Sequence, residues 1–491
     1  YSNHLITSVT FPDFMTSIDA YAFGNCSNLK TVRGACVTQV DEYAFNYCSK
    51  LEEVNFLPLE KLGKSAFLTC SKLKSVSLSD SLAEIPEDCF SQCVALESIV
   101  LPSAEGLVLR DGCFEFCDGL KSVTFKNNTF SIEKYAFSSC DLLEEITIPA
   151  TCTDIGYHAF AYCGLKKLTI GTSVTNSAFE YCKELSEVTL LEGVKRVEID
   201  AFRDSKVESL NFPASCESVL VQALDVYGGY YTPKFILKYF TVADGNPVLK
   251  KSGDCLIDIG QKKVIMGLDN AQIPDDGSVE TIGLYAFCKR ELGDVVLPES
   301  VVRIDTGAFY QSTIESIVLS KVQNINTEAF RQCENLQSVE FNDGLKWIGS
   351  DAFEYCKSLK VVSLPENCSF GSWAFAYCSA LESVALPPQM NILPNCAFKG
   401  CSALKEIVVP SRVEIIQASV FDGCTSLESV VLPSTVKSIY SDAFKQTAVE
   451  EIEFGGTVEE WQQVYKGSSR PFIERPVKIK CSDGTVEETF E

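Results

Sequence analysis

The sequence predicts an α/β solenoid with one long parallel sheet of about 19 rungs on one face and short helical turns on the other. Two observations support this: a phenylalanine, usually preceded by alanine, recurs mostly every 22 or 23 residues, and a strand-like segment follows it in each period. Such a period indicates stacked supersecondary units. The recurring phenylalanines are Phe23, Phe45, Phe67, Phe90, Phe114, Phe137, Phe160, Phe179, Phe202, Phe287, Phe309, Phe330, Phe353, Phe375, Phe398, Phe421 and Phe444.

The strand-like segment has the pattern Leu-x-x-Val-x-Leu and is often closed by proline. Clear copies are Leu96–Leu101 and Leu427–Leu432, and nineteen copies run from Ile6–Phe11 to Val449–Phe454. Apolar residues alternate with polar ones, as in a strand with one buried face. Stacked at about 4.8 Å per rung, nineteen strands would span roughly 90 Å.

The segment around the phenylalanine predicts the opposite face. A cysteine often follows the phenylalanine by three residues, and a leucine follows the cysteine by three more. This stretch has the length of one helical turn, with Ser, Asp or Gly nearby to end it. A polar spacer with an apolar pair, as in Val436-x-x-Ile439, completes the period.

The period fails between Phe202 and Phe287, which divides the chain. We expect a first array of repeats, a degenerate repeat with an inserted β-hairpin, a second array, and a C-terminal cap. A Tyr/Gly-rich stretch surrounds Tyr227–Tyr231, and the hairpin strands Cys255–Ile259 and Lys263–Met266 flank Gly260-Gln261. A structural insert is favoured over a ligand site here. The four segments are residues 1–224, 225–278, 279–454 and 455–491.

The two ends of the array differ. Thr457-Val-Glu-Glu460 is a capping box that predicts a short helix, with Trp461 and Val464 on one face. Val477–Cys481 would add a final strand. The chain begins almost directly on the strand Ile6–Phe11, from which we expect further residues upstream, because an uncapped solenoid end exposes core.

The repeat resembles the BspA-type, or Treponema-type, leucine-rich repeat of bacterial and protist surface proteins. The resemblance rests on segments such as Ala352–Leu359 and on Leu364-Pro365, and it covers nearly the whole chain. It implies a leucine-rich repeat solenoid at the cell surface or outside the cell. It also implies a non-enzymatic role in protein–protein interaction or adhesion, with host extracellular or cell-surface proteins among the partners.

Charge and motifs exclude several other functions. The net charge of −24 argues against nucleic acid or an anionic membrane surface as partner. No apolar run of 18 residues is present, so we expect no transmembrane segment. The chain has only two histidines, His4 and His158, and lacks GxGxxG, GxxxxGK[ST] and HExxH motifs. We therefore expect neither an enzyme nor a cofactor.

The 23 cysteines also fit the repeat. Stacked thiols would have parallel Cβ vectors about 4.8 Å apart, which does not suit a disulfide, and no CxxC pairing suggests zinc. We expect a buried column of reduced thiols and no metal. Some cysteines outside that column, including Cys89 and Cys368, occupy positions where other repeats have Ala or Val. Thirteen share the register position: Cys26, Cys48, Cys70, Cys93, Cys117, Cys140, Cys163, Cys182, Cys333, Cys356, Cys378, Cys401 and Cys424.

The candidate binding residues lie on the open face of the sheet, beside the central valine of each strand. A Lys/Glu alternation after the opening leucine is more consistent with strand register than with a ligand site. A serine-rich column precedes the valine, and an intermittent apolar stripe follows it in the second array. An exposed stripe would suit an extended peptide or a protein, but valine also simply favours strands. The candidates are Val296, Ser316, Val318, Ser338, Glu340, Ser383, Val408, Ser429 and Val431.

An aromatic column one residue before the register cysteine offers a second surface. Its members include Tyr47, Tyr162, Tyr355 and Tyr377. Stacked tyrosines can bind sugars or proteins, although covering the solenoid is the favoured interpretation. The alternative function is therefore a structural or carbohydrate-contacting surface module without a dedicated protein ligand.

Overall fold

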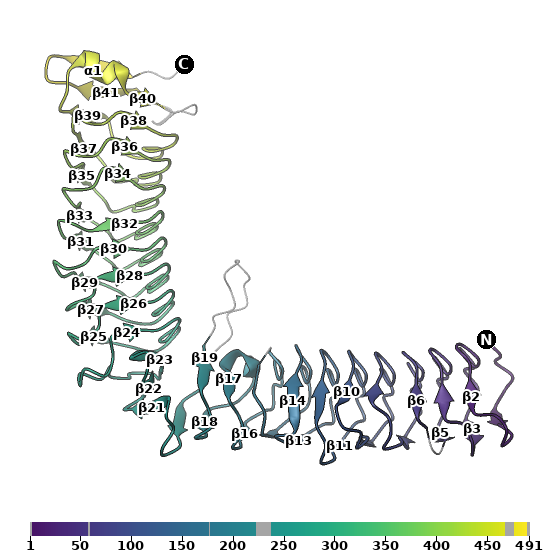
Figure 1. Ribbon diagram of the computed structural model, residues 1–491. Helices are drawn as coiled ribbons and strands as arrows, with labels where there is room; N and C mark the ends of the chain where they lie inside the picture. The colour runs from purple at the N-terminus through teal and green to yellow at the C-terminus, as the bar shows by residue number, and fades with distance from the viewer. Residues whose placement is uncertain (1, 57–58, 176, 222–236, 467–475, 489–491) are drawn as a thin grey trace. The chain divides into compact units, whose positions relative to one another are not determined.

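The computed structural model describes residues 2–56, 59–175, 177–221, 237–466 and 476–488 (Figure 1). The chain forms two compact units, Tyr1–Leu249 and Lys250–Glu491. Each is a β-solenoid, and together they comprise about 19 turns, with almost no helix in the parts of the chain that are described. The inserted stretch around Tyr227–Tyr231 lies outside the described residues.

Each turn contributes a strand to the open face and, in most turns, a shorter strand to a second column. The Leu-x-x-Val-x-Leu segments form the open-face strands, such as β31 (Val361–Ser363) and β33 (Ser383–Ala385), which pair in parallel register. The apolar pairs of the polar spacers form the second column, as in β30 (Trp347–Ile348) and β32 (Ser369–Phe370). The prediction of one long sheet was therefore incomplete, because the spacers are strands too.

The strands of the first unit alternate between the two columns, except that β15 and β16 both lie on the open face. Its open-face strands are β1 (Ser8–Thr10), β3 (Thr31–Gly34), β5 (Glu53–Phe56), β7 (Ser75–Val76), β9 (Ser98–Val100), β11 (Ser122–Thr124), β13 (Glu145–Ile148), β15 (Lys167–Ile170), β16 (Glu187–Leu190), β18 (Ser209–Phe212) and β20 (Tyr239–Val242). Its second column contains β2 (Ser17–Ile18), β4 (Gln39–Val40), β6 (Lys61–Leu62), β8 (Glu84–Ile85), β10 (Leu107–Leu109), β12 (Phe130–Ile132), β14 (Cys152–Ile155), β17 (Arg196–Glu198) and β19 (Ser218–Leu220).

The second unit repeats the arrangement. Its open-face strands are β25 (Asp294–Val296), β27 (Ser316–Val318), β29 (Ser338–Glu340), β31, β33, β35 (Glu406–Val408), β37 (Ser429–Leu432), β39 (Glu451–Phe454), β41 (Val477–Lys480) and β42 (Thr485–Glu488). The second column comprises β21 (Leu249–Ser252), β22 (Cys255–Asp258), β23 (Lys263–Gly267), β24 (Thr281–Ile282), β26 (Arg303–Ile304), β28 (Asn324–Ile325), β30, β32, β34 (Ile392–Leu393), β36 (Ile415–Ile416), β38 (Ser438–Ile439) and β40 (Tyr465–Lys466).

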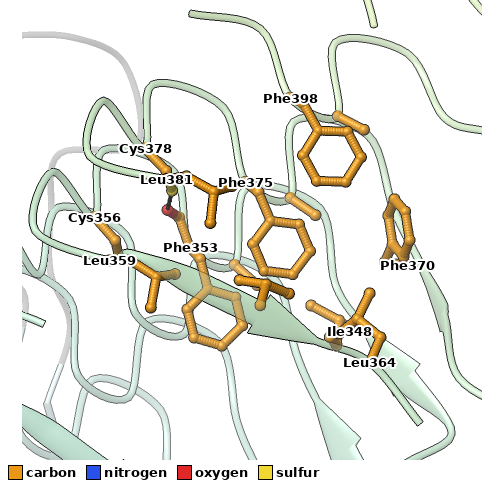
Figure 2. Close-up of a cluster of buried hydrophobic side chains, with 14 of the residues drawn as sticks. Ile348, Phe353, Cys356, Leu359, Leu364, Phe370, Phe375, Cys378, Leu381 and Phe398 are labelled. Atoms are coloured by element: carbon orange, nitrogen blue, oxygen red, sulfur yellow. Dashed lines mark hydrogen bonds between the residues drawn. The ribbon is translucent and has the colours of Figure 1, made fainter. Parts of the chain in front are cut away.

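The recurring phenylalanines form a stack along the interior of each unit. The ring centroids of Phe353 and Phe375 are 5.3 Å apart with an interplanar angle of 2°, and both residues are fully buried (Figure 2). The backbone follows the same spacing, since the N–H of Phe353 donates to the carbonyl of Ala374 in the next turn at 2.8 Å. Aromatic stacking and the backbone ladder therefore enforce one common period.

The expected helical turns around the phenylalanine are absent, and that part of the prediction was wrong. Asp351 and Tyr355, on either side of Phe353, have φ angles of 57° and 60°. Left-handed residues interrupt a right-handed helix after a single turn. The segment instead contains separate tight turns, such as the one closed by the N–H of Cys356 on the carbonyl of Phe353 at 3.2 Å. Within the described ranges, the helices are α1 (Val458–Gln463) and the 3₁₀ turn Ile199–Phe202.

The predicted hairpin and C-terminal elements are present. β22 and β23 pair antiparallel, and β23 then pairs in parallel with β24, so the hairpin extends the second strand column of its unit. Thr457 and Glu460 form the capping box of α1, whose Trp461 is buried. β41 adds a parallel strand beside β39.

The cysteines form no disulfide, as predicted, and 21 of the 23 are buried, the exceptions being Cys36 and Cys288. In the register column, the thiol of one turn donates to the phenylalanine carbonyl of the turn before it. The Sγ of Cys378 lies 3.2 Å from the carbonyl oxygen of Phe353. Burial raises the pKa of the Cys333 thiol to about 12, which keeps it protonated and unreactive at neutral pH.

We predict that the donor at this position matters more than its volume. Cys378→Val removes the hydrogen bond and adds a methyl group to a filled column, so it should lower the free energy of unfolding by about 1–3 kcal/mol. Cys378→Ser keeps a hydroxyl donor, and serine already occupies the equivalent position at Ser312. It should therefore cost less than Cys378→Val. Urea unfolding measures both.

Cys216 provides the matched control. It is buried outside the register column, and its thiol makes only a long contact of 3.7 Å to the carbonyl of Ser218. Cys216→Val should therefore be tolerated better than Cys216→Ser. The same order of stabilities at both positions would contradict the role given to the thiol donor.

Candidate binding surface

On the open face of the second unit, four strands carry a valine directly after the central apolar residue. Val296 is 68% exposed and Val408 is 64% exposed, whereas Val318 and Val431 are half-buried. Strand register places Val296 next to Val318 and Val408 next to Val431. The predicted stripe is thus present as two separate valine pairs.

Acidic residues border these valine pairs. Glu340 is aligned with Val318, and Glu453 is aligned with Val431. In the neighbouring serine-rich column, Glu406 and Glu451 lie on either side of Ser429. On the next strand, Lys478 is aligned with Glu451 and Lys480 with Glu453. The surface therefore combines apolar patches with charged residues, among which Glu340 and Glu406 are not aligned with a lysine.

The predicted serines occupy the outward positions of the same strands. Ser338, Ser383 and Ser429 are exposed. Ser316 is half-buried, and its hydroxyl donates to the Asp294 carboxylate at 2.6 Å. Ser316 is therefore engaged within the sheet.

Sequence reasoning missed Val361, which is 56% exposed in the serine column. Register places it beside Ser383. The sequence could have revealed Val361, because many of the other repeats have serine at that position. Val361 adds apolar area to the part of the open face between the two valine pairs.

The Lys/Glu alternation forms ion pairs between neighbouring turns of the first unit. The Lys121 Nζ lies 3.1 Å from Glu97, and the Lys166 Nζ lies 2.7 Å from Glu144. The paired side chains are more than half exposed, so each pair contributes at most about 1 kcal/mol. Their arrangement agrees with a role in strand register.

Members of the aromatic column on successive turns stack on each other, although Tyr47 and Tyr162 in the first unit are 47% and 49% exposed. The rings of Tyr355 and Tyr377 stack at 4.6 Å with an interplanar angle of 8°. On the next turn, a Cβ at Gly400 would approach the Tyr377 ring to 2.5 Å, so backbone lies close to that ring as well. Tyr377 thus has little free ring face, which favours the structural interpretation of this column.

A buried ionic cluster lies among the turns of the second unit. The Arg331 Nη1 lies 2.7 Å from the Glu328 carboxylate, and its Nε lies 2.6 Å from Glu354 without hydrogen-bond alignment. Burial raises the pKa of Glu354 to about 7 despite the nearby guanidinium. Since the arginine pairs internally with these acids, the cluster is structural.

The two histidines make contacts with different character. The His4 Nδ1 lies 2.9 Å from the Ser27 hydroxyl at an exposed site. The His158 Nε2 lies 2.7 Å from the buried Glu180 carboxylate, which also pairs with Arg203. Desolvation lowers the pKa of His158, with a further contribution from Arg203. Among the described residues, no group of three or more His, Cys, Asp or Glu side chains is arranged to hold a metal ion.

Comparison with protein families gives a match over most of the chain. The model of the BspA type leucine rich repeat region, in six copies, matches residues 1–106, 108–225, 265–378 and 348–468. No curated protein sequence matches the chain.

Several solved structures are similar at low sequence identity. A leucine-rich repeat protein from Eubacterium ventriosum is 20% identical, with 62% of this chain and 83% of that chain covered and a TM-score of 0.49. A leucine rich cell surface protein from Faecalibacterium prausnitzii is 21% identical, with 94% and 90% covered and a TM-score of 0.28. The pneumococcal vaccine antigen PcpA is 18% identical, with 80% and 84% covered and a TM-score of 0.31. With TM-scores below 0.5, these likenesses add nothing to the family match.

We predict that Glu354 makes stability depend on pH. Its folded pKa of about 7 exceeds the ordinary value of 4.5, so the folded state retains a proton that the unfolded state has released. Stability from this group is present below about pH 4.5 and is lost as the pH rises through about 7. Between pH 4.5 and 8, the free energy of unfolding should therefore fall by on the order of 1–3 kcal/mol less in Glu354→Gln than in the unmodified protein. Thermal or urea unfolding at several pH values measures the difference.

Glu382→Gln, a change at an exposed acid of the open face, serves as the control. It should retain the pH dependence of the unmodified protein. An unchanged pH dependence in Glu354→Gln would contradict the assignment of the raised pKa to this carboxyl group.

Proposed function

The chain belongs to the family of BspA-type leucine-rich repeat proteins, and we propose that it binds another protein through the open sheet face of its second unit. Leucine-rich repeat proteins are generally interaction modules and typically non-enzymatic scaffolds. The observation that carries the proposal is the exposure of Val296 and Val408, each aligned with a second valine on that face. Extended sheet surfaces are the usual binding surfaces of solenoids.

The chemistry of this face defines the partner. Exposed valines gain free energy when an apolar surface covers them, at about 25 cal/mol per Å² removed from water. Glu340 and Glu406 border the valine pairs, whereas Glu453, beside Val431, is aligned with Lys480. The fitting partner therefore presents apolar side chains flanked by Lys or Arg, and charge complementarity would speed association.

We place this interaction at the cell surface or outside the cell, where it would serve adhesion. Support comes from the family, whose members include bacterial surface proteins. The net charge of −24 is compatible with a basic protein partner and unfavourable for nucleic acid or anionic membranes. No helix in the described part of the chain is long and apolar enough to cross a membrane.

The second candidate is a structural or carbohydrate-contacting surface module. The stacked pair Tyr355 and Tyr377 motivates it, although their mutual stacking leaves little ring face for a sugar. Glycan-array binding that is lost on changing both tyrosines to alanine would favour this candidate over protein binding.

We predict that Val318→Glu combined with Val408→Glu weakens capture of extracellular-matrix proteins at least about tenfold. Each added carboxylate would be buried against the apolar side chains of the partner, and the cost of desolvating that charge weakens binding. Because the partner should be basic, capture by the unmodified protein should also weaken as salt rises from 50 to about 500 mM. Surface plasmon resonance with immobilised matrix proteins measures both effects.

Val100→Glu is the matched control, since Val100 is 53% exposed at the same strand position in the first unit. It should leave capture unchanged. Equal capture by the unmodified protein and the double variant would eliminate this face as the binding site.

A further inference from the structure

The second strand column of the second unit is interrupted between β32 and β34. Strands β24, β26, β28, β30 and β32 pair successively, and pairing begins again from β34 through β36, β38 and β40. Within the described residues of this unit, β32 and β34 are not paired. The first unit has a similar interruption between β6 and β8.

A proline explains each interruption. In a continuous column, the residue after the apolar pair donates its N–H to the preceding turn, as Gly371 does to Ile348 at 2.9 Å and Gln417 does to Leu393 at 3.0 Å. Pro394 occupies this position after β34, and Pro86 occupies it after β8. Proline has no N–H to donate. The carbonyl of Phe370 therefore lacks the partner that its equivalents in neighbouring turns have.

A pocket opens at the interruption in the second unit. Its apolar lining includes Met390, Ile392 and Pro394. None of its lining residues is charged, although 22% of the chain is Asp, Glu, Lys or Arg. Its main polar lining residues are Asn367, Ser369, Ser372, Gln389, Asn391 and Gln417.

Another hollow, in the first unit, shows the contrast. It is lined by Leu142 and by charged residues that include Lys166 and Glu144. Those two side chains already form an ion pair at 2.7 Å. In the pocket beside Pro394, the Gln389 amide donates to Glu366 at 3.1 Å, and the Gln417 amide oxygen accepts from the Asn395 N–H at 2.8 Å. Asn367, Ser372 and Asn391 remain as its uncharged donors and acceptors.

An exposed tryptophan stands next to this pocket. Trp347 in β30 is aligned with Ser369 in β32, and it is 39% exposed. Ser350, from the same turn as Trp347, also lines the pocket. Trp347 does not itself line the pocket, but its alignment with the lining residue Ser369 places an indole on the strand beside the hydrogen-bonding groups of the pocket.

We propose that the pocket between β32 and β34 binds an uncharged sugar residue, with Trp347 covering one apolar face of the ring. A pyranose carries hydroxyls that both donate and accept, which Asn, Gln and Ser side chains match. Its C–H face suits the indole. The uncharged lining provides no counter-charge for a phosphate, a sulfate or a uronic acid. The site lies on the second strand column and is independent of the valine pairs on the open face.

Saturation-transfer NMR with the whole chain tests the ligand class. The probes are glucose, galactose, mannose and N-acetylglucosamine, with glucuronate and glucosamine as charged comparators. At least one neutral sugar should bind, and charged comparators should bind at least about fivefold more weakly. Trp347→Ala and Asn391→Ala should each weaken binding at least about tenfold with an unchanged melting temperature, whereas Tyr440→Ala, at an exposed aromatic elsewhere in the column, should not.

Pro394→Asn tests the origin of the pocket. Asn326 already occupies the equivalent position and donates its N–H to Ile304 at 2.9 Å. The variant restores a donor, so it should close the interruption and abolish sugar binding without lowering the melting temperature. Pro86→Asn makes the same change in the first unit and should leave binding intact.

Three outcomes would overturn the proposal. They are the failure of all four neutral sugars to bind, equal binding of the charged comparators, and sugar binding that survives both Pro394→Asn and Trp347→Ala.

Discussion

The structure depends on the stacking of each turn on its two neighbours. The phenylalanine rings lie in contact, as Phe353 and Phe375 do at 5.3 Å, and the adjoining N–H groups bond to the next turn. No turn encloses a core alone, so its stability is shared with adjacent turns. The common spacing aligns every other position of the period. It places the thiols, the ion pairs and the open-face valines in columns.

Periodic features could be predicted from the sequence because they repeat. The thiol column, the hairpin at β22 and β23, and the capping box at Thr457 follow from residue types at fixed spacings. The left-handed turns could not be predicted, because residues such as Asp351 and Tyr355 adopt positive φ without the glycine that usually signals it. The helical expectation failed for that reason.

The candidate sites depend on departures from the repeat, which are harder to interpret in isolation. Val361 replaces a serine, and its exposure matters only because Ser383 lies beside it. Pro394 alone resembles an ordinary turn residue. Only comparison with Gly371 and Gln417 shows that it lacks the N–H that donates to the preceding turn. In both cases the consequence lies in an adjacent turn, about 22 residues away in sequence. The buried columns hold the fold constant while such exposed positions vary.

Hydrogen exchange of Phe375→Ala tests the dependence on stacking most directly. Removing a fully buried ring should cost about 3–5 kcal/mol. Amide exchange should accelerate in the turns on both sides, including the N–H groups of Phe353 and Phe398, because their ring neighbour is lost. The outward change Val361→Ala should leave exchange nearly unchanged. Faster exchange confined to the turn that carries residue 375 would contradict shared stability.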